Sequence, residues 1–262
     1  MCLLVLAWRA TSDHRLVLVG NRDEFHARPT SAMHWWESPR VLAGRDLEAG
    51  GTWLGLDADG RFAVVTNHRS PPYASGARSR GELIPRFLAG TAGPRAYLES
   101  LRPEAAVFAG FSLLAGDRNE LAYFSNRDLS GPRTLAPGVY GLSNALLDTP
   151  WPKLTRTRAR LQALIDAPAA QRAALGAEPL LDLLTDRDRA LDEELPDTGV
   201  GRDRERWLSS PFIVGPDYGT RCTTALVLRD DGAGEAIERS YGPDGGATSV
   251  QHFALPEPAQ AR

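Results

Sequence analysis

The second residue of the chain combines a thiol with chemistry that the chain terminus can supply. Position 2 is Cys2, and a small residue there permits removal of the initiator Met1. Removal would leave a thiol and a free α-amine on one residue. An α-amine has a reference pKa of about 7.7–8.0 and a cysteine thiol one of about 8.5, so the amine can take the thiol proton near neutral pH. The sequence therefore predicts a self-activated N-terminal nucleophile that attacks an acyl carbonyl.

The elements that must position this cysteine are the first two expected strands. Residues 2–8 and 16–19 are continuously apolar and β-prone, and polar residues between them favour a turn. Continuous apolar runs are typical of strands that are buried on both faces. We therefore expect a hairpin deep in a sheet that is covered on both sides.

The register of this hairpin decides which side chains lie beside Cys2. Opposed residues of an antiparallel pair have a constant index sum, so a turn centred between Ser12 and Asp13 sets Cys2 opposite Asp23. The register is defined to within one or two residues, which makes Arg22 an equivalent neighbour. A carboxylate there could bind the α-ammonium group, and a guanidinium could stabilise the thiolate.

The rest of the chain places helices between further strands. Turn residues between apolar runs predict hairpins at 53–67, 108–125 and 223–241, and a further strand is expected at 139–143. Helical spacing of apolar residues predicts helices at 81–88, 95–101, 153–165 and 180–184, whereas 186–206 is expected to be a charged loop. This order favours one α+β domain over 1–262, with helices outside antiparallel sheets and a flexible tail over about 256–262.

Composition excludes several classes of function. The net charge is −3, from 30 basic and 33 acidic residues, which gives no electrostatic case for nucleic acid or an anionic membrane. The apolar run 2–8 is too short for an integral membrane segment and lacks the features of a signal peptide. Cys2 and Cys222 form no disulfide framework, and the five histidines show no metal spacing. We expect no metal, a reducing compartment and a cytoplasmic location, while the oligomeric state stays open.

Several motifs along the chain resemble one family. The run 21–30, which begins Asn-Arg-Asp-Glu, is similar to the signature of the NRDE family, the transport and Golgi organisation protein 2 family. The resemblance continues at 42–46, 50–55, 66–67, 79–83, 141–153, 195–199 and 218–221. It implies a four-layer αββα sandwich, the N-terminal-nucleophile hydrolase fold, and a likeness to penicillin V acylases and bile salt hydrolases.

The resemblance also implies roles for particular residues. Cys2 matches the nucleophile and Asp23 the carboxylate that binds the α-amine. Arg22 stands for the arginine near the thiol, although acylases space that arginine further from the carboxylate. Asn67 ends a strand as the oxyanion-hole residue does, and Asn144 resembles the second asparagine of the site.

Four more residues complete the expected site. Arg221 resembles a late arginine of the acylases, which could pair with the Asp23 carboxylate or hold a substrate carboxylate. Asn21, His68 and Trp53 are candidates for substrate binding. An oxyanion needs donors aimed at it, which an asparagine amide can supply.

Two functions follow from these observations. The first is a cysteine hydrolase or acyltransferase that cleaves a non-peptide amide or a thioester of a small acylated substrate, without a cofactor. The alternative is a carrier that binds or traffics haem or an acyl ligand on the same fold without turnover, since a fold does not fix a function. The resemblance also links the family to haem trafficking and to lipid and coenzyme A metabolism.

Overall fold

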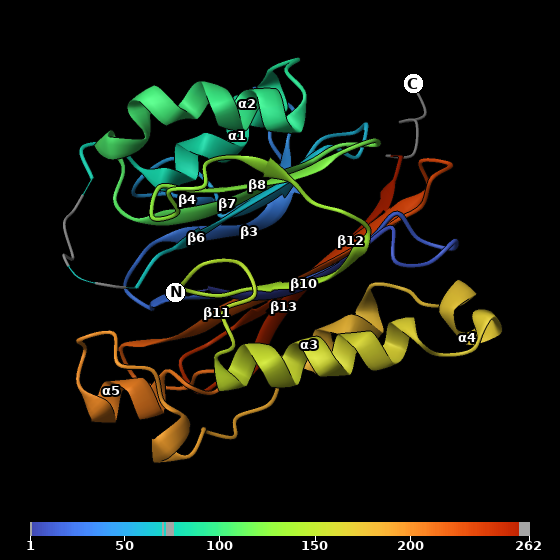
Figure 1. Cartoon of the computed structure of the whole chain (residues 1–262). Helices are drawn as coiled ribbons and strands as arrows, with labels where there is room; N and C mark the ends of the chain where they lie inside the picture. Colours follow the sequence, from blue (N-terminus) through green and yellow to red (C-terminus); the bar gives the residue numbers. More distant parts are fainter. Residues whose placement is uncertain (1, 70, 72–75, 257–262) are drawn as a thin grey trace.

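The computed structural model describes residues 2–69, 71 and 76–256 as two antiparallel sheets packed face to face and enclosed by helices (Figure 1). The six-stranded sheet has the order β10 (Gly138–Leu142), β1 (Cys2–Trp8), β2 (Leu16–Phe25), β11 (Tyr218–Leu228), β12 (Gly234–Tyr241) and β13 (Ala247–Leu255). The seven-stranded sheet runs in chain order through β3 (Thr30–Trp35), β4 (Leu42–Asp46), β5 (Leu54–Leu56), β6 (Phe62–Asn67), β7 (Phe111–Gly116), β8 (Leu121–Ser125) and β9 (Arg133–Thr134).

Helices cover the outer face of each sheet. The helices α1 (Leu83–Ala89) and α2 (Pro94–Leu101), with the 3-10 segments η1 (Arg80–Glu82) and η2 (Arg102–Val107), accompany the seven-stranded sheet (Figure 1). On the other side lie α3 (Pro152–Ile165), α4 (Ala169–Ala173), α5 (Arg202–Trp207) and the 3-10 segments η3 (Glu178–Leu184) and η4 (Asp192–Glu194). The predicted α+β class and αββα layering are therefore confirmed. No helix in the described ranges is both long and apolar enough to cross a membrane.

Three apolar clusters hold the four layers together. Leu4, Leu18 and Val64 belong to the cluster between the two sheets, and Phe87 and Leu161 belong to the clusters beneath the two helical layers. Every residue of β1 is buried, as its continuous apolar run predicts. Burial on both faces fixes the position of the strand that begins at Cys2.

The first hairpin is present, but its predicted register is wrong by one residue. Cys2 lies opposite Arg22, and the last pair before the loop joins Trp8 to Leu16. The connection between them has an odd number of residues, and the Arg9 amide closes it with a hydrogen bond to the Arg15 carbonyl at 2.8 Å. The centre of the turn is therefore a residue rather than a peptide bond, which shifts each pairing by one.

Other expected elements are confirmed with adjusted ends. The predicted hairpins correspond to β5–β6, β7–β8 and β11–β12, and the single strand to β10. The helices expected at 81–88, 95–101 and 153–165 are α1, α2 and α3, whereas 180–184 is part of the 3-10 segment η3. The expected charged loop at 186–206 contains η4 and the start of α5, so that expectation is wrong in part. Most of the expected tail lies outside the described residues, which end at 256.

Candidate active site

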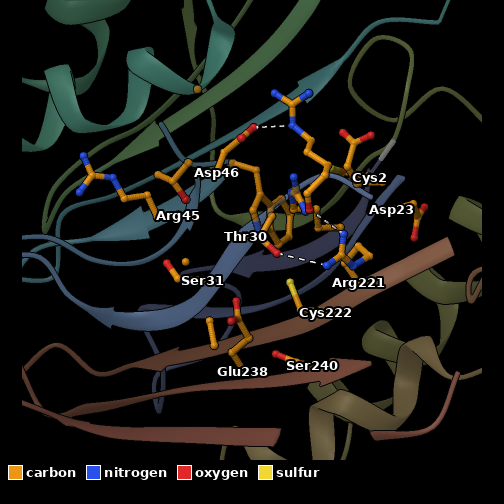
Figure 2. Close-up of a pocket in the computed structure, with 18 of the residues that line it drawn as sticks. Cys2, Asp23, Thr30, Ser31, Arg45, Asp46, Arg221, Cys222, Glu238 and Ser240 are labelled. Carbon is orange, nitrogen blue, oxygen red and sulfur yellow. Dashed lines mark hydrogen bonds and ion pairs between the residues drawn. The ribbon is translucent and has the colours of Figure 1, made fainter. Parts of the chain in front are cut away.

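A polar cavity of about 440 Å³ lies at the end of β1 where the two sheets meet (Figure 2). The six-stranded sheet contributes residues of β1, β2, β11, β12 and β13, and the seven-stranded sheet contributes residues of β3, β4 and β6. Segment η1 adds Arg80 and Gly81. Cys2 lines this cavity and is 7% exposed. The first residue of β1 thus presents a thiol to a cavity that both sheets shape.

Four side chains form a row across the floor of this cavity. Cys2 pairs with Arg22, Arg22 pairs with Cys222 on its other side, and Cys222 pairs with Ser240. Opposed residues of neighbouring strands point to the same face of a sheet, so Cys2 and Cys222 flank Arg22 on the face that lines the cavity. Burial raises the pKa of the Cys2 thiol, and the positive charge of Arg22 opposes this rise.

Asp23 occupies the next position of β2 and is almost fully buried. Its Oδ1 accepts a hydrogen bond of 2.8 Å from Thr220 Oγ1. Burial raises the pKa of the Asp23 carboxyl, and the charge of Lys153 opposes this rise. Lys153 lies in the first turn of α3, is 2% exposed and donates to the carbonyl oxygen of Leu208 at 2.9 Å. A buried carboxylate and a buried ammonium group therefore lie behind Cys2.

Two asparagines meet on the opposite side of the thiol. The side-chain nitrogen of Asn144 donates to Asn67 Oδ1 at 2.8 Å. The neighbouring Ser143 donates to the carbonyl oxygen of Cys2 at 3.1 Å, and the Thr66 hydroxyl donates to the carbonyl oxygen of Ser143 at 2.8 Å. Asn67 lines the cavity at the end of β6. The segment that carries Asn144 is thus bonded both to β1 and to β6.

Arg221, one of the predicted site residues, donates hydrogen bonds to neighbouring backbone carbonyl oxygens. Arg221 Nη1 donates to the carbonyl oxygens of Phe25 at 2.7 Å and Arg28 at 3.1 Å, and its Nη2 donates to Thr30 Oγ1 at 3.3 Å (Figure 2). Arg221 therefore lines the cavity and holds the connection between β2 and β3. The expected pairing with Asp23 is not among the interactions of Arg221 that the structure contains.

The three candidates for substrate binding are placed differently from one another. Trp53 lines the cavity. Asn21 is fully buried and lies outside the cavity lining, because its amide donates to the carbonyl oxygens of Leu184 and Pro211 and accepts from Thr223. His68 is half-buried beyond the end of β6 and also lies outside the lining.

The structure adds residues that the sequence did not single out. Arg28, Arg80 and Glu238 line the cavity, and Lys153 lies behind it. For Lys153 a signal existed, because it is the only lysine among 30 basic residues. All other basic residues of the chain are arginines, and Lys153 lies within a mostly apolar helical stripe. This combination could have predicted a buried site residue.

Comparison with known proteins agrees with this architecture. A family model described as Transport and Golgi organisation 2 matches residues 1–243. The Transport and Golgi organization protein 2 homolog of Bos taurus is 38% identical, with 92% of this chain and 93% of that protein covered. The homologue of Homo sapiens is 36% identical, with 87% of each chain covered.

A solved structure shares the fold at much lower sequence identity. It is the mutant C2A conjugated bile acid hydrolase from Clostridium perfringens, with a TM-score of 0.55 and 12% identity. The match covers 100% of this chain and 94% of that one. At this identity the likeness establishes the N-terminal-nucleophile hydrolase fold.

Proposed function

Because the chain belongs to the Transport and Golgi organisation 2 family and has the fold of N-terminal-nucleophile hydrolases, we propose that it is a cysteine hydrolase or acyltransferase. Its substrate would be a small acylated molecule that carries a non-peptide amide or a thioester. One observation carries the proposal: the thiol of Cys2 lies at the start of a buried strand and opens into a cavity that Asn67 also lines. The presence of free thiols suits a reducing compartment such as the cytoplasm.

The reaction begins with removal of Met1, which frees the α-amine of Cys2. This amine takes the thiol proton, and the sulfur attacks the acyl carbon to form a C–S bond and a tetrahedral oxyanion. The α-ammonium group then protonates the departing amine or thiol, which leaves an acylated Cys2. Water, or a second acceptor, attacks this thioester and releases the acyl group. In this second attack the α-amine takes the proton of the water or acceptor and passes it to the Cys2 sulfur as the C–S bond breaks. The α-amine thus accepts a proton in each attack and gives it to each leaving group, so no separate histidine is needed.

The neighbouring residues fit this sequence of steps. Asp23 is the carboxylate nearest in register to Cys2, and we assign it to orient the α-ammonium group. Asn67 would donate to the oxyanion from its side-chain nitrogen, because its oxygen already accepts from Asn144. Arg22 lies directly beside the thiol in the sheet and favours the thiolate.

The test is the intact mass of the purified protein, before and after brief treatment with limiting iodoacetamide. We expect a mass without Met1 and one fast adduct. Cys2→Ala should lose this adduct. Cys222→Ser should keep it, because Cys222 has no α-amine of its own to take the thiol proton and burial raises the pKa of its thiol well above the usual value. A retained Met1, or labelling of Cys2 no faster than that of a peptide thiol, would contradict the mechanism and favour the carrier function.

A further inference from the structure

The cavity beside Cys2 contains more guanidinium groups than its carboxylates neutralise. Its charged lining consists of five arginines and four acidic residues, which are Arg22, Arg28, Arg45, Arg80, Arg221, Asp23, Glu24, Asp46 and Glu238. The formal balance is close to even, so the pairing of the individual groups decides what charge a ligand would meet.

Among the described residues, one of these arginines is paired directly with carboxylates. Arg28 Nε lies 2.8 Å from Asp46 Oδ2, and its Nη1 lies 3.2 Å from Glu48 Oε1. Arg80 donates only to the carbonyl oxygen of Gly110, at 3.0 Å. The Arg22 guanidinium makes neither a hydrogen bond nor an ion pair with any residue that the structure describes. Both guanidinium groups are half-buried and line the cavity.

The two remaining arginines also lack a carboxylate partner among the described residues. Arg221 donates to two carbonyl oxygens and one hydroxyl, and Arg45 donates to the Gly50 carbonyl and stacks on the Trp36 ring, 4.6 Å from its centroid. In Figure 2, Arg45 and Arg221 lie on opposite sides of the view, so a guanidinium group stands at each end of the residues drawn. Neutral oxygens satisfy hydrogen bonds but leave the charges uncompensated.

Two of the four acidic residues are buried and already accept hydrogen bonds from the protein. Glu238 is 2% exposed and accepts from the Met33 amide at 2.7 Å, and burial raises the pKa of its carboxyl. Asp23 is 1% exposed, and burial raises the pKa of its carboxyl as well. The Asp46 carboxylate forms an ion pair with Arg28. Glu24, the fourth acidic residue, accepts from a backbone amide at 2.9 Å. The guanidinium groups of Arg22 and Arg80 therefore line the cavity without a carboxylate partner among the described residues.

Building on the proposed nucleophile, we infer that the acylated substrate carries a carboxylate or a phosphate group, which the guanidinium groups of Arg22 and Arg80 bind while the acyl carbon faces Cys2. Both anions match the planar fork of arginine, and burial strengthens such pairs relative to water. Arg22 adjoins Cys2 in the sheet, and Arg80 enters from the opposite layer. The anion is thus held between the sheets, next to the thiol.

A pair of alkylating reagents tests the inference, because iodoacetate and iodoacetamide share a reacting carbon and differ in charge. We expect the ratio of the iodoacetate to the iodoacetamide rate at Cys2 to exceed that of an N-terminal cysteine peptide by about tenfold or more. The excess should saturate with iodoacetate and fall as ionic strength rises. An equal ratio in protein and peptide would overturn the inference.

Variants locate the charge that produces this ratio. Arg80→Gln should lower the ratio by about threefold or more, and Arg45→Gln serves as a second test if Arg80→Gln fails to fold. Arg102→Gln is the matched control, since Arg102 is exposed, lies in η2 and pairs with Glu99 away from the cavity. A ratio that falls equally in the control would show that only net charge matters and would overturn the assignment to the cavity.

Failure of the nucleophile and failure of the anion site give different results. Rapid alkylation by iodoacetamide without preference for iodoacetate would leave the proposed function standing and remove the inference. If Cys2 is unreactive, calorimetry of Cys2→Ala with pyrophosphate and with succinate still tests the anion site. Binding that Arg80→Gln weakens supports the site, and the stronger of the two ligands distinguishes phosphate from carboxylate. Absence of binding by both ligands overturns it.

Discussion

The side-chain amide of Asn144 donates a hydrogen bond of 2.8 Å to the side-chain oxygen of Asn67. This bond joins the segment after β10 to the end of β6, which belong to different sheets. It also fixes the rotation of the Asn67 amide, because its oxygen faces Asn144 and its nitrogen is left to face the cavity. Among the described residues, no acceptor takes a hydrogen bond from this nitrogen. The pair therefore presents one oriented donor beside Cys2.

Removal of the Asn67 donor should slow acylation of Cys2 without slowing its alkylation. Acylation by p-nitrophenyl acetate forms an oxyanion, whereas alkylation by iodoacetamide does not. We expect Asn67→Ala to slow the burst of p-nitrophenol by roughly 10²–10³-fold, the usual effect of losing one oxyanion donor. Asn144→Ala should slow it less, because it removes the orientation of the donor and not the donor itself. Stopped-flow absorbance measures the burst, and mass spectrometry measures alkylation.

Asn119→Ala is the control for this pair, since Asn119 is exposed in the turn between β7 and β8. Its burst should equal that of the wild type. Equal slowing of acylation and alkylation in Asn67→Ala would contradict the oxyanion role and indicate a disturbed thiol.

The pH dependence of Cys2 alkylation should move in opposite directions when two neighbouring charges are removed. The charge of Arg22 lowers the pKa of the thiol, and the charge of Glu24 raises it. Arg22→Gln should therefore move the midpoint of the rate profile to higher pH, and Glu24→Gln should move it to lower pH. Measurement of the iodoacetamide rate between pH 5 and 10 gives the midpoint for each variant, and the prediction concerns the direction in which it moves. Movement of both variants in the same direction would show that packing, not charge, controls the thiol.

Lys153 gives a direct test of the buried charges behind the site. Burial lowers the pKa of this ammonium group to about 8. Since it is the only lysine of the chain, lysine-selective ¹⁵N labelling yields one side-chain signal whose titration reports this pKa. A midpoint near the ordinary value of about 10.4 would contradict the burial of the charge.

The same group makes a signed prediction about stability. Its folded pKa lies below its unfolded value, so the unfolded chain binds more protons between pH 8 and 10.4, and the free energy of unfolding rises across that interval. Relative to Lys153→Met, the wild type should gain about 3 kcal/mol from pH 7 to 10.5. Urea unfolding at both pH values measures the difference. A difference between the two proteins that does not change with pH would rule out the linkage.

The apolar pattern of the buried strands predicted antiparallel sheets with helices outside them, and the family resemblance implied the four layers. The continuous apolar run of β1 has no exposed face, so its burial follows directly. Strands β3 and β4 were missed because their polar residues line the cavity, and β13 was missed because it is an edge strand whose residues alternate toward solvent. Strands that serve the site or the sheet edge therefore carry the weakest signal.

The candidate site was predictable where sequence neighbours remain neighbours in space. Arg22 and Asp23 follow from the hairpin, although the odd loop length reversed which of them faces Cys2. Arg80 and Glu238 come from η1 and β12, and only the packing of one sheet on the other brings them to the cavity. No spacing along the chain encodes that approach. Arg80 lies within the family motif at 79–83, but the motif alone does not show that its side chain reaches the cavity.

The buried ion pair between Arg69 and Glu205 should contribute strongly to stability when one partner is removed. Arg69 Nη2 lies 2.8 Å from Glu205 Oε2, and the two side chains are 5% and 3% exposed. Glu205 Oε1 also accepts from the amide and the hydroxyl of Thr198, and the Arg69 amide donates to the carbonyl oxygen of Asn144 at 2.7 Å. The pair therefore fixes both the 198–205 segment and the segment that carries the site asparagine.

Glu205→Gln should lower the free energy of unfolding by about 3–5 kcal/mol, because it leaves a buried guanidinium without its counter-charge. Replacing both partners with Arg69→Met and Glu205→Leu should recover much of this loss, since two apolar groups carry no desolvation cost. Asp192→Asn is the matched control, because it removes a carboxylate from an exposed partner, Arg206. It should leave the urea midpoint nearly unchanged. If Glu205→Gln unfolds at the same urea concentration as this control, the buried pair does not stabilise the fold in the way its geometry indicates.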